Sequence, residues 1–498
     1  MSAAVMLPVG ALAPSLLASI VIFLLPEDRH RVRILVNLGA AVVKLLLVVV
    51  MIWGVFQGRD YGLRFTMLPG VDFVLRADAL AVMFAGLSAL LWLFTTVYAI
   101  GYLEGSPNRS RFFGFFSLCV ASTLGIALAG NLFTFFLFYE MLTLATYPLV
   151  VHRGTPEALG AGRKYLAYTL SGGVVLLVGI AWLHGVAGDL SFQKGGHFAN
   201  VDPSTSGALI PIFILLIAGL GVKTAVFPLH GWLPSAMVAP APVSALLHAV
   251  AVVKAGAFGI VRVVFDIYGL EISEALGLLD ALRWLAAFTI IYGSVRALSQ
   301  IDLKRRLAFS TVSQISYIIL GISLFGPVGA AGGLVHLLHQ GIMKVTLFFC
   351  AGNYAETLGK HRIDELDGVG RRMPVTSAAF TIGAFGMIGT PPLAGFVTKW
   401  TLGSGALAAG MEWVVLVLVA SSLLNAAYFL PVLHRLWFRQ AAGPWPDGPF
   451  GGRFETGAWL LWPPLFTAAG TVLVGVLAAM PFSPLSWAEL IAAREYLP

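Results

Sequence analysis

Charged residues are scarce in this chain of 498 residues. Lys, Arg, Asp and Glu together make up 11% of it, whereas a typical soluble domain carries about 25%. Hydrophobic residues make up 58%, and the mean hydropathy is +0.88. Length alone would suggest about three soluble domains, but this composition excludes that interpretation and favours an integral membrane protein.

Cysteine and cofactor-binding motifs are also sparse. The only two cysteines, Cys119 and Cys350, lie within apolar runs, and we interpret both as small residues that pack between helices. The sequence has no CxxC, no cluster-type cysteine spacing and no GxGxxG motif after a strand. We therefore expect no cofactor in this chain, and electron transfer, if coupled to it, must occur elsewhere.

Long polar stretches are missing as well. The longest interruption between apolar runs, near residues 188–206, is too short for a separate soluble domain. Apolar runs of about 20 residues mark membrane helices, so we predict one all-α membrane domain over residues 1–498. Its fourteen predicted helices are 3–25, 33–55, 78–102, 112–130, 132–151, 164–187, 207–229, 240–265, 276–298, 306–325, 328–354, 374–402, 409–437 and 457–480.

The basic residues divide unequally between the two sides of this topology. With the N-terminus placed outside, 19 of the 31 Lys and Arg residues, Arg453 among them, fall in predicted cytoplasmic loops. Six fall on the opposite side: Arg59, Arg64, Arg76, Lys194, Arg283 and Arg494. Cytoplasmic loops of membrane proteins carry such an excess. The formal charge of +7 is then a topology signal that requires no nucleic-acid partner, and both termini are expected outside.

Six basic residues remain, and all lie within predicted helices: Lys44, Lys223, Lys254, Arg262, Lys344 and Lys399. An ionisable group at mid-membrane costs roughly 2.5–3.5 kcal/mol and commonly marks an ion or proton path. We interpret Lys44 as snorkelling or facing a partner subunit, and Arg262 as a structural residue that reaches the interface. The other four lysines are the functional candidates.

Carboxylates are rarer still within the predicted spans. Of 24 Asp and Glu residues, only Glu140 is placed well inside a helix. Hard cations such as Na⁺ prefer several oxygen ligands, so this scarcity argues against a Na⁺ site and favours protons.

Two of the candidate lysines lie beside proline-rich interruptions. Lys223 precedes Pro228 and Pro234, and Lys399 follows Pro391 and Pro392. Proline leaves helix carbonyls without partners, which a membrane protein tolerates only where protein or water satisfies them. Two broken helices, five helices apart, are typical of a transporter built from inverted repeats.

Histidines accompany the other two lysines. His248 and Lys254 are six residues apart and are expected on roughly opposite faces of one helix. His336 and His339 share a face of another helix, which also carries Lys344. No carboxylate or thiolate accompanies the histidines, so we expect no metal site there.

A buried lysine is close to balance between its two protonation states. Keeping it charged costs about 3 kcal/mol, and neutralising it at pH 7 from an ordinary pKa of about 10.4 costs about 4.6 kcal/mol. A nearby carboxylate can decide the outcome. We therefore hypothesise a lateral proton relay in the order Glu140, Lys223, His248 and Lys254, His339 and Lys344, and Lys399.

Several segments resemble the antiporter-like membrane subunit family shared by respiratory complex I, Mrp-type cation/proton antiporters and membrane-bound hydrogenases. The matching segments are FYEMLTLATYPL around Glu140, VKTAVFPLHGWLPSAMVAPAPVSALLHA from Lys223 to His248, IDLKRRLAFSTVSQ at 301–314, HQGIMKVTLFFCAG around Lys344 and GTPPLAGFVTKW around Lys399. The resemblance covers nearly the whole chain.

The resemblance implies fourteen helices with two inverted five-helix repeats, 112–265 (helices 4–8) and 276–437 (helices 9–13), and breaks in helices 7 and 12. It also implies that Glu140 and Lys223 load the proton, that His248 or Lys254 connects, and that Lys344 leads to the exit at Lys399. Such subunits work with other membrane subunits in a bacterial-type plasma membrane, where a partner can exchange Na⁺.

Lysine at position 399 and the chain end soon after the fourteenth helix resemble the D-type member of Mrp antiporters. A proton-pumping subunit of complex I or of a membrane hydrogenase is the alternative. A secondary solute transporter would share the broken helices but not the row of lysines. A membrane transferase would need a catalytic loop at the interface, whereas Asp302, Asp364, Glu365 and Asp367 lie beside basic residues and are interpreted as solvated helix ends.

Overall fold

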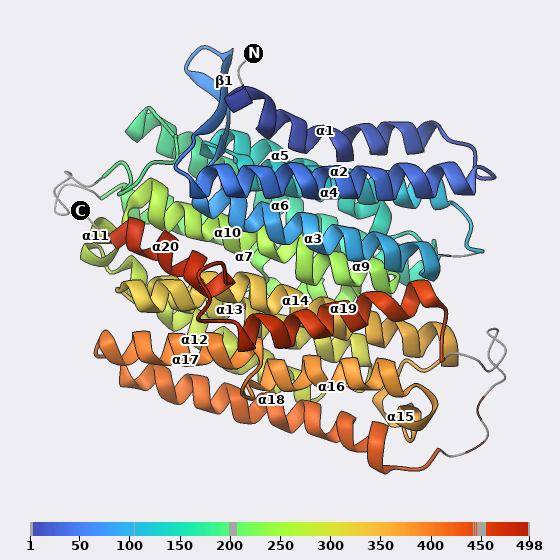
Figure 1. Cartoon of the computed structure of the whole chain (residues 1–498). Coiled ribbons are helices and arrows are strands. Elements are labelled where there is room, and N and C mark those ends of the chain that lie inside the picture. The colour runs from blue at the N-terminus through green and yellow to red at the C-terminus, as the bar shows by residue number, and fades with distance from the viewer. Residues whose placement is uncertain are drawn as a thin grey trace.

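The computed structural model describes residues 3–103, 105–198, 207–441, 443, 445 and 455–496. In these residues the chain forms a bundle of helices that lie roughly side by side, with one short β-hairpin (Figure 1). The first part of the bundle contains α1 (Ala3–Leu24), α2 (His30–Phe56), α3 (Ala79–Tyr102), α4 (Arg109–Leu128), α5 (Leu132–Val150), α6 (Pro156–Ala187), α7 (Leu209–Thr224), η2 (Leu229–Gly231), α8 (Trp232–Ser235), η3 (Ala236–Val238), α9 (Ala241–Ala245), η4 (Leu246–Val250), α10 (Val252–Arg262) and η5 (Val263–Tyr268).

The second part continues with helices of similar length. They are α11 (Leu270–Ala275), α12 (Leu278–Leu298), α13 (Leu303–Ser323), α14 (Pro327–Leu358), η6 (Ile363–Glu365), α15 (Val369–Arg372), α16 (Pro374–Ile388), α17 (Ala394–Ala408), α18 (Glu412–Phe438), α19 (Ala458–Val476) and α20 (Pro484–Tyr496). Each of the fourteen predicted segments contains helix. Among the described residues, eleven helices are long and apolar enough to cross a membrane, which confirms the prediction of a helical membrane protein.

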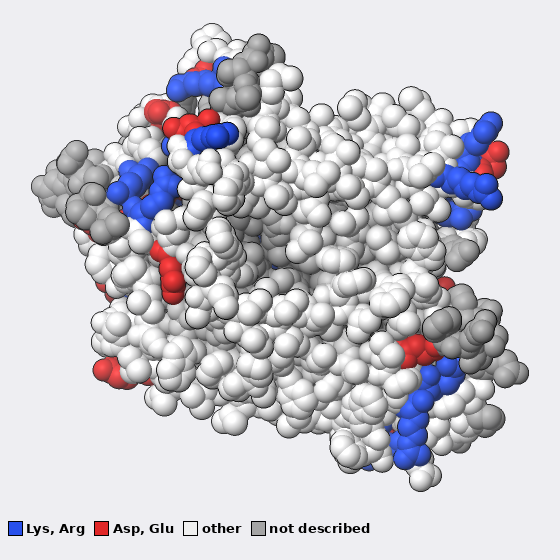
Figure 2. Space-filling view, in the orientation of Figure 1, with Lys and Arg blue, Asp and Glu red and all other residues white. Residues whose placement is uncertain are grey.

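Charged side chains are concentrated at the two ends of the bundle. On the face shown in Figure 2, the Lys, Arg, Asp and Glu side chains gather at these ends, and the surface between them is almost free of charge. We call one end the basic end; it contains the loops 25–29, 151–155, 299–302 and 359–373. The other, the hairpin end, carries β1 (Tyr61–Leu68) and β2 (Val71–Ala77), and both described chain ends lie there (Figure 1). Arg453 lies outside the described residues.

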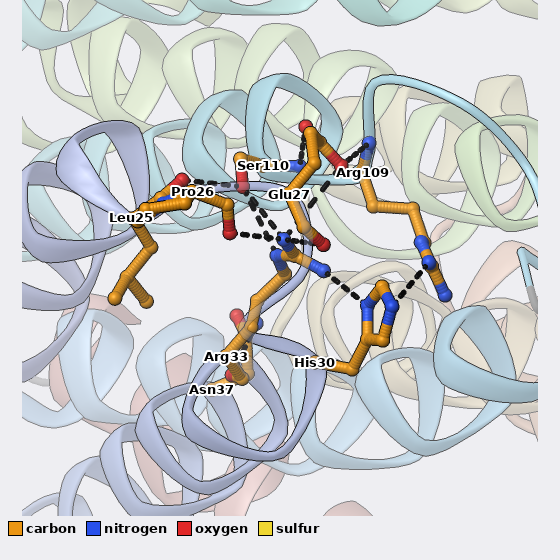
Figure 3. Close-up of polar contacts among 8 residues, drawn as sticks. All are labelled: Leu25, Pro26, Glu27, His30, Arg33, Asn37, Arg109 and Ser110. Carbon is orange, nitrogen blue, oxygen red and sulfur yellow. Dashed lines mark hydrogen bonds and ion pairs between the residues drawn. The ribbon is translucent and has the colours of Figure 1, made fainter.

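The basic end is fixed by a network around Arg33 at the start of α2 (Figure 3). The buried Arg33 guanidinium donates to Ser110 Oγ at 2.9 Å and to the carbonyl oxygens of Pro26 and Glu27. The Glu27 carboxylate accepts from the backbone N–H groups of Arg109 and Ser110 at 3.0 and 2.9 Å. A carboxylate suits a helix N-terminus, whose first N–H groups lack helical partners. The network therefore joins α1, α2 and α4.

Both predicted interruptions occur. α7 ends at Thr224, and its C-cap Ala225 adopts a left-handed φ of 59° before the short turns η2, α8 and η3. α16 ends at Ile388, followed by Gly389 at φ 94°, and α17 begins at Ala394. Between these broken elements runs α14, whose membrane-spanning window is 94% buried. The interruptions thus border the centre of the bundle.

Besides short helices such as α11, η6 and α15, the β-hairpin and α20 were not predicted. The β-hairpin pairs Tyr61 with Ala77 and is closed by an ion pair between Arg64 and Asp72. α20 packs on α14 and α3, and its Trp487 Nε1 donates to the carbonyl oxygen of Ala79 at 2.9 Å. Both segments lack a long apolar run, so a search for membrane-length runs does not detect them.

Candidate functional site

Lys223 lies in the last turn of α7, beside the first interruption. Its side chain is fully buried, and its Nζ donates to the carbonyl oxygen of Tyr139 in α5. The same nitrogen lies 3.2 Å from the centroid of the Tyr139 ring. The face of an aromatic ring attracts a cation, so Tyr139 provides both an acceptor and a negative surface for Lys223.

Glu140, the predicted partner of Lys223, follows Tyr139 on α5 but does not reach the amine. No ion pair joins Glu140 to Lys223 among the described residues. Its carboxylate turns toward α6, where a Cβ built at Gly173 would lie 2.5 Å from Oε1. Glu140 is half-buried, and its Oε1 finds no hydrogen-bond partner in the described part of the chain. The two residues are neighbours that are not in contact.

His248 and Lys254 both face α14, which contradicts the expectation that they lie on opposite faces. The His248 ring packs on Phe348 with a centroid separation of 4.6 Å, and Lys254 Nζ donates to the carbonyl oxygen of Leu337 at 2.7 Å. The cause is the π-helical turn η4, in which the Ala251 N–H bonds the carbonyl oxygen of Leu246. Such a turn holds an extra residue and so changes the phase of the helix.

Lys344 points toward the beginning of α13 instead of toward Lys399. Its Nζ donates to the carbonyl oxygen of Leu307 at 3.1 Å and to Ser310 Oγ. Both acceptors lie in the first two turns of α13, next to the basic end. The predicted direct step from Lys344 to Lys399 therefore has no contact to support it.

The two predicted histidines of α14 have different neighbours. His339 Nδ1 lies 2.9 Å from Thr398 Oγ1 in α17, and His336 packs against Tyr317 of α13 with a centroid separation of 5.1 Å. The described residues contain no group of three or more His, Cys, Asp or Glu that could hold a metal ion.

Lys399 satisfies the open end of a broken helix. Its Nζ donates to the carbonyl oxygens of Ile388 at 2.7 Å and Met387 at 3.3 Å, and to Ser422 Oγ at 2.8 Å. The last carbonyls of a helix have no partner within it and carry a partial negative charge. The break between α16 and α17 thus provides acceptors for a cation, which explains why a lysine follows the prolines.

The four lysines share one mode of binding. Each ammonium group donates to at least one backbone carbonyl oxygen of another helix, and none forms an ion pair with a described carboxylate. An ammonium has three donors, so Lys223, Lys254 and Lys344 can take further partners, whereas Lys399 already has three acceptors. The four amines form a row that crosses the bundle, and neutral oxygens bind them. Because no carboxylate is paired with any of them, no single amine is held permanently in its protonated form.

The structure corrects the interpretation of Lys44 and shows the partners of Arg262, the two remaining basic residues in the helices. Lys44 neither snorkels nor faces a partner: it is fully buried, with Nζ 4.5 Å from the centroid of Trp92 in α3. Arg262 does not reach solvent either. Its side chain is 2% exposed and pairs with Asp78 and Asp266 at 2.8 Å each. Ile491 and Glu495 of α20 line the same pocket as Arg262, so this helix helps to enclose the charge.

Sequence reasoning missed Lys304 at the mouth of a cavity. Lys304 donates to the carbonyl oxygen of Ala239 at 2.6 Å, and with Arg153, Asp302 and His361 it lines a cavity of about 480 Å³ at the basic end. Burial lowers the pKa of Lys304 to about 7. Lys304 belongs to the charged segment IDLKRR, whose charge pattern is typical of the solvated end of a helix.

Sequence reasoning also missed uncharged polar residues near the histidines. Buried polar atoms without a partner in the described protein belong to Gln314, Tyr317, His336, Gln340 and Ser421. A buried polar group without a hydrogen bond costs about 1–3 kcal/mol, and proteins usually satisfy such groups with internal water. The presence of polar residues in the middle of an apolar helix was the signal in the sequence that could have identified them.

Comparison with known proteins gives consistent results. Residues 129–425 match the family described as NADH:quinone oxidoreductase/Mrp antiporter, TM. The chain is 36% identical over 411 residues to the N-type member of the NADH-quinone oxidoreductase of Desulforudis audaxviator, covering 79% of each chain. It is 28% identical over 376 residues to the D-type member of the Na⁺/H⁺ antiporter of Bacillus subtilis, covering 75% of each.

A solved structure, that of the Mrp complex from Dietzia sp. DQ12-45-1b, contains a chain of the same fold. The TM-score is 0.86 at 26% sequence identity, and the match covers 100% of this chain and 98% of that one. These matches confirm the resemblance that the sequence motifs indicated.

Proposed function

The chain belongs to the NADH:quinone oxidoreductase/Mrp antiporter transmembrane family, and from this premise we propose that it is the proton-translocating, antiporter-like subunit of a multi-subunit membrane complex. The observation that carries the proposal is the row of three buried amines and the half-buried Lys399, each held by backbone oxygens of a neighbouring helix. Protons move along such a row when an amine gives up H⁺ to a neutral neighbour and regains its hydrogen bond afterwards.

In the proposed path, Glu140 and Lys223 load the proton, and His248 and Lys254 connect across the centre. His336 and His339 continue toward Lys399 at the exit, while Lys344 branches toward the basic end. The separation of Glu140 from Lys223 supports a loading pair that is open in this arrangement, because a carboxylate in contact would hold the lysine protonated. Both ends of the path, Glu140 and Lys399, are only half-buried, as groups that exchange protons with water or partner subunits require.

For the topology we propose fourteen membrane spans in a single domain over residues 1–498, with inverted repeats at 112–265 and 276–437. Each unit contains one broken helix that carries a lysine, and a pair of broken helices is typical of inverted repeats, although Lys223 precedes its break and Lys399 follows its own. We place both termini outside a bacterial-type plasma membrane, with the basic end in the cytoplasm.

The Mrp D-type assembly is our first choice of complex, because lysine occupies position 399 and the match to the chain of the Mrp complex extends over the full length. The identity of 36% to a member of an NADH-quinone oxidoreductase supports the alternative, a proton-pumping redox complex. The partners are then other membrane subunits, and Na⁺ exchange belongs to the complex.

The test uses the assembled complex in proteoliposomes that contain a pH-sensitive dye. Lys223→Ala and Glu140→Ala are expected to abolish proton movement while the subunit still assembles. The exposed Lys194 gives a matched control, and Lys194→Ala should transport normally. Response to added Na⁺ supports the Mrp-type assembly, and response to an electron donor supports the redox complex. Normal proton movement in the Lys223 and Glu140 variants would contradict the proposal.

A further inference from the structure

Tyr317 of α13 lies near both a histidine and the exit lysine. Its side chain is fully buried, and its ring lies 5.1 Å from the ring of His336 in α14, centroid to centroid. On the α17 side, Lys399 Nζ lies 5.8 Å from the same ring centroid. One aromatic ring is therefore a neighbour of both the histidine and the exit lysine.

The hydroxyl group of Tyr317 is not used for packing. It has no hydrogen-bond partner among the described residues, and the same holds for both amide atoms of Gln314 and both ring nitrogens of His336. Gln314 precedes Tyr317 by three residues, so the two share a face of α13. These atoms lie together in the bundle interior, where polar groups are satisfied by water if protein does not supply a partner.

Two serines of α18 connect the neighbourhood of Tyr317 with that of Lys399. Ser421 of α18 neighbours the Tyr317 hydroxyl, and its Oγ is buried without a partner in the described protein. The next residue, Ser422, accepts a hydrogen bond from Lys399 Nζ at 2.8 Å. The polar atoms thus continue from His336 through Tyr317 to the site of the exit amine, whereas Lys344 is bound at the other end of α13.

We propose that the Tyr317 hydroxyl carries the proton from His336 to Lys399, and that Gln314 and Ser421 position it. The proposal rests on the proposed proton-translocating function and replaces the step from Lys344. Protonated His336 donates to the tyrosine oxygen directly or through one water, while the original O–H proton leaves toward the neutral Lys399 amine. The histidine ends neutral, the lysine ends charged, and the tyrosine is regenerated unchanged, so no net charge remains on the ring.

The decisive variant is Tyr317→Phe, which keeps the ring and removes only the hydroxyl. Tyr354→Phe is the matched control, because Tyr354 is equally buried in α14 but its hydroxyl already bonds Ser377 Oγ at 3.1 Å. In proteoliposomes with the assembled complex, Tyr317→Phe should slow proton translocation about tenfold or more and change its D₂O solvent isotope effect. The translocation rate of Tyr354→Phe should stay within about twofold of the wild-type rate, because this hydroxyl takes no part in the proton transfer.

Two further variants separate proton transfer from packing. Tyr317→His restores a proton-carrying group and should recover part of the rate lost in Tyr317→Phe. Gln314→Met leaves the ring untouched and should also slow translocation, so it tests the proposal even if Tyr317→Phe does not assemble. A rate and isotope effect equal to wild type in Tyr317→Phe, or in Gln314→Met if only that variant assembles, would overturn the proposal.

Lys399→Met distinguishes a failure of this inference from a failure of the proposed function. If the wild-type complex moves protons and Lys399→Met stops them, a normal Tyr317→Phe complex refutes the tyrosine step alone. If Lys399→Met moves protons like the wild type, the relay itself is wrong and the tyrosine step falls with it.

Discussion

The ammonium group of Lys254 in α10 donates a hydrogen bond to the carbonyl oxygen of Leu337 in α14, across 2.7 Å. The acceptor is a backbone atom, so the amine is held without an opposite charge. Two of its three donors remain available. The hydrogen bond to Leu337 therefore fixes the position of the Lys254 ammonium group. Because no carboxylate is paired with it, the group can still release its proton to a neighbour.

Replacement of Lys254 should separate transport from stability. Lys254→Met removes a charge whose placement in the membrane costs about 3 kcal/mol and keeps most of the side-chain volume. Proton translocation should fall about tenfold or more, whereas the thermal unfolding temperature of the solubilised complex should not fall. Unchanged translocation would show that Lys254 serves packing alone.

Lys44→Met should behave differently. Lys44 is fully buried, but its only close aromatic or polar contact among the described residues is the Trp92 ring at 4.5 Å. It lies in α2, away from the row that crosses the bundle. We expect transport close to wild type in proteoliposomes and an equal or higher unfolding temperature. Loss of transport would make Lys44 part of the path.

Gly389 should not tolerate a side chain. It adopts φ 94°, and a Cβ there would lie 2.7 Å from Cδ of Lys399. Gly389→Ala should therefore displace the lysine from the carbonyls of α16 and reduce translocation. Gly410→Ala is the matched control, because Gly410 has φ 68° but no atom within 4 Å of an added Cβ. Equal rates in the two variants would mean that backbone strain, not displacement of Lys399, causes the effect.

Lys304 should give translocation a pH dependence. Burial lowers the pKa of Lys304 to about 7, so the amine is mostly charged below pH 7 and mostly neutral above it. Proton uptake from the cavity requires the neutral amine, and the wild-type rate at a constant driving force should rise as the pH at the basic end increases through about 7. Lys304→Arg stays charged and should lose this rise.

Lys360, a basic-end lysine in the loop after α14, provides the control for that profile. Lys360→Arg should keep the wild-type pH dependence, because the change preserves charge outside the cavity lining. A profile that is identical in the wild type and in Lys304→Arg would exclude Lys304 from proton uptake.

The helices and the two breaks were predictable because their signals are local. Apolar runs mark the long helices from α1 to α19, and prolines follow the ends of α7 and α16. Lys223 and Lys399 could be assigned to these breaks for the same reason, since a cation suits unpaired helix carbonyls. The contacts of Lys344 with α13 were not predictable in this way, because the direction of a side chain depends on which helix packs beside it, and the order of the relay stays a prediction.

The contacts of His248 and Lys254 could not be predicted from their spacing. A π-helical turn between them depends on packing against α14 and has no clear sequence signal. The acceptors of the lysines were also hidden, because every residue type has a carbonyl oxygen. The enclosure of Arg262 depended on α20, which is too short and too polar to be recognised as a membrane helix.

The π-helical turn at Leu246–Val250 sets the direction in which Lys254 points. An α-helix turns by about 100° and rises 1.5 Å per residue. Because the wide turn holds one residue more than an α-helical turn, deleting that residue would rotate α10 by about this angle and carry Lys254 away from Leu337. One extra residue in the backbone thus determines which helix accepts a hydrogen bond from a buried charge.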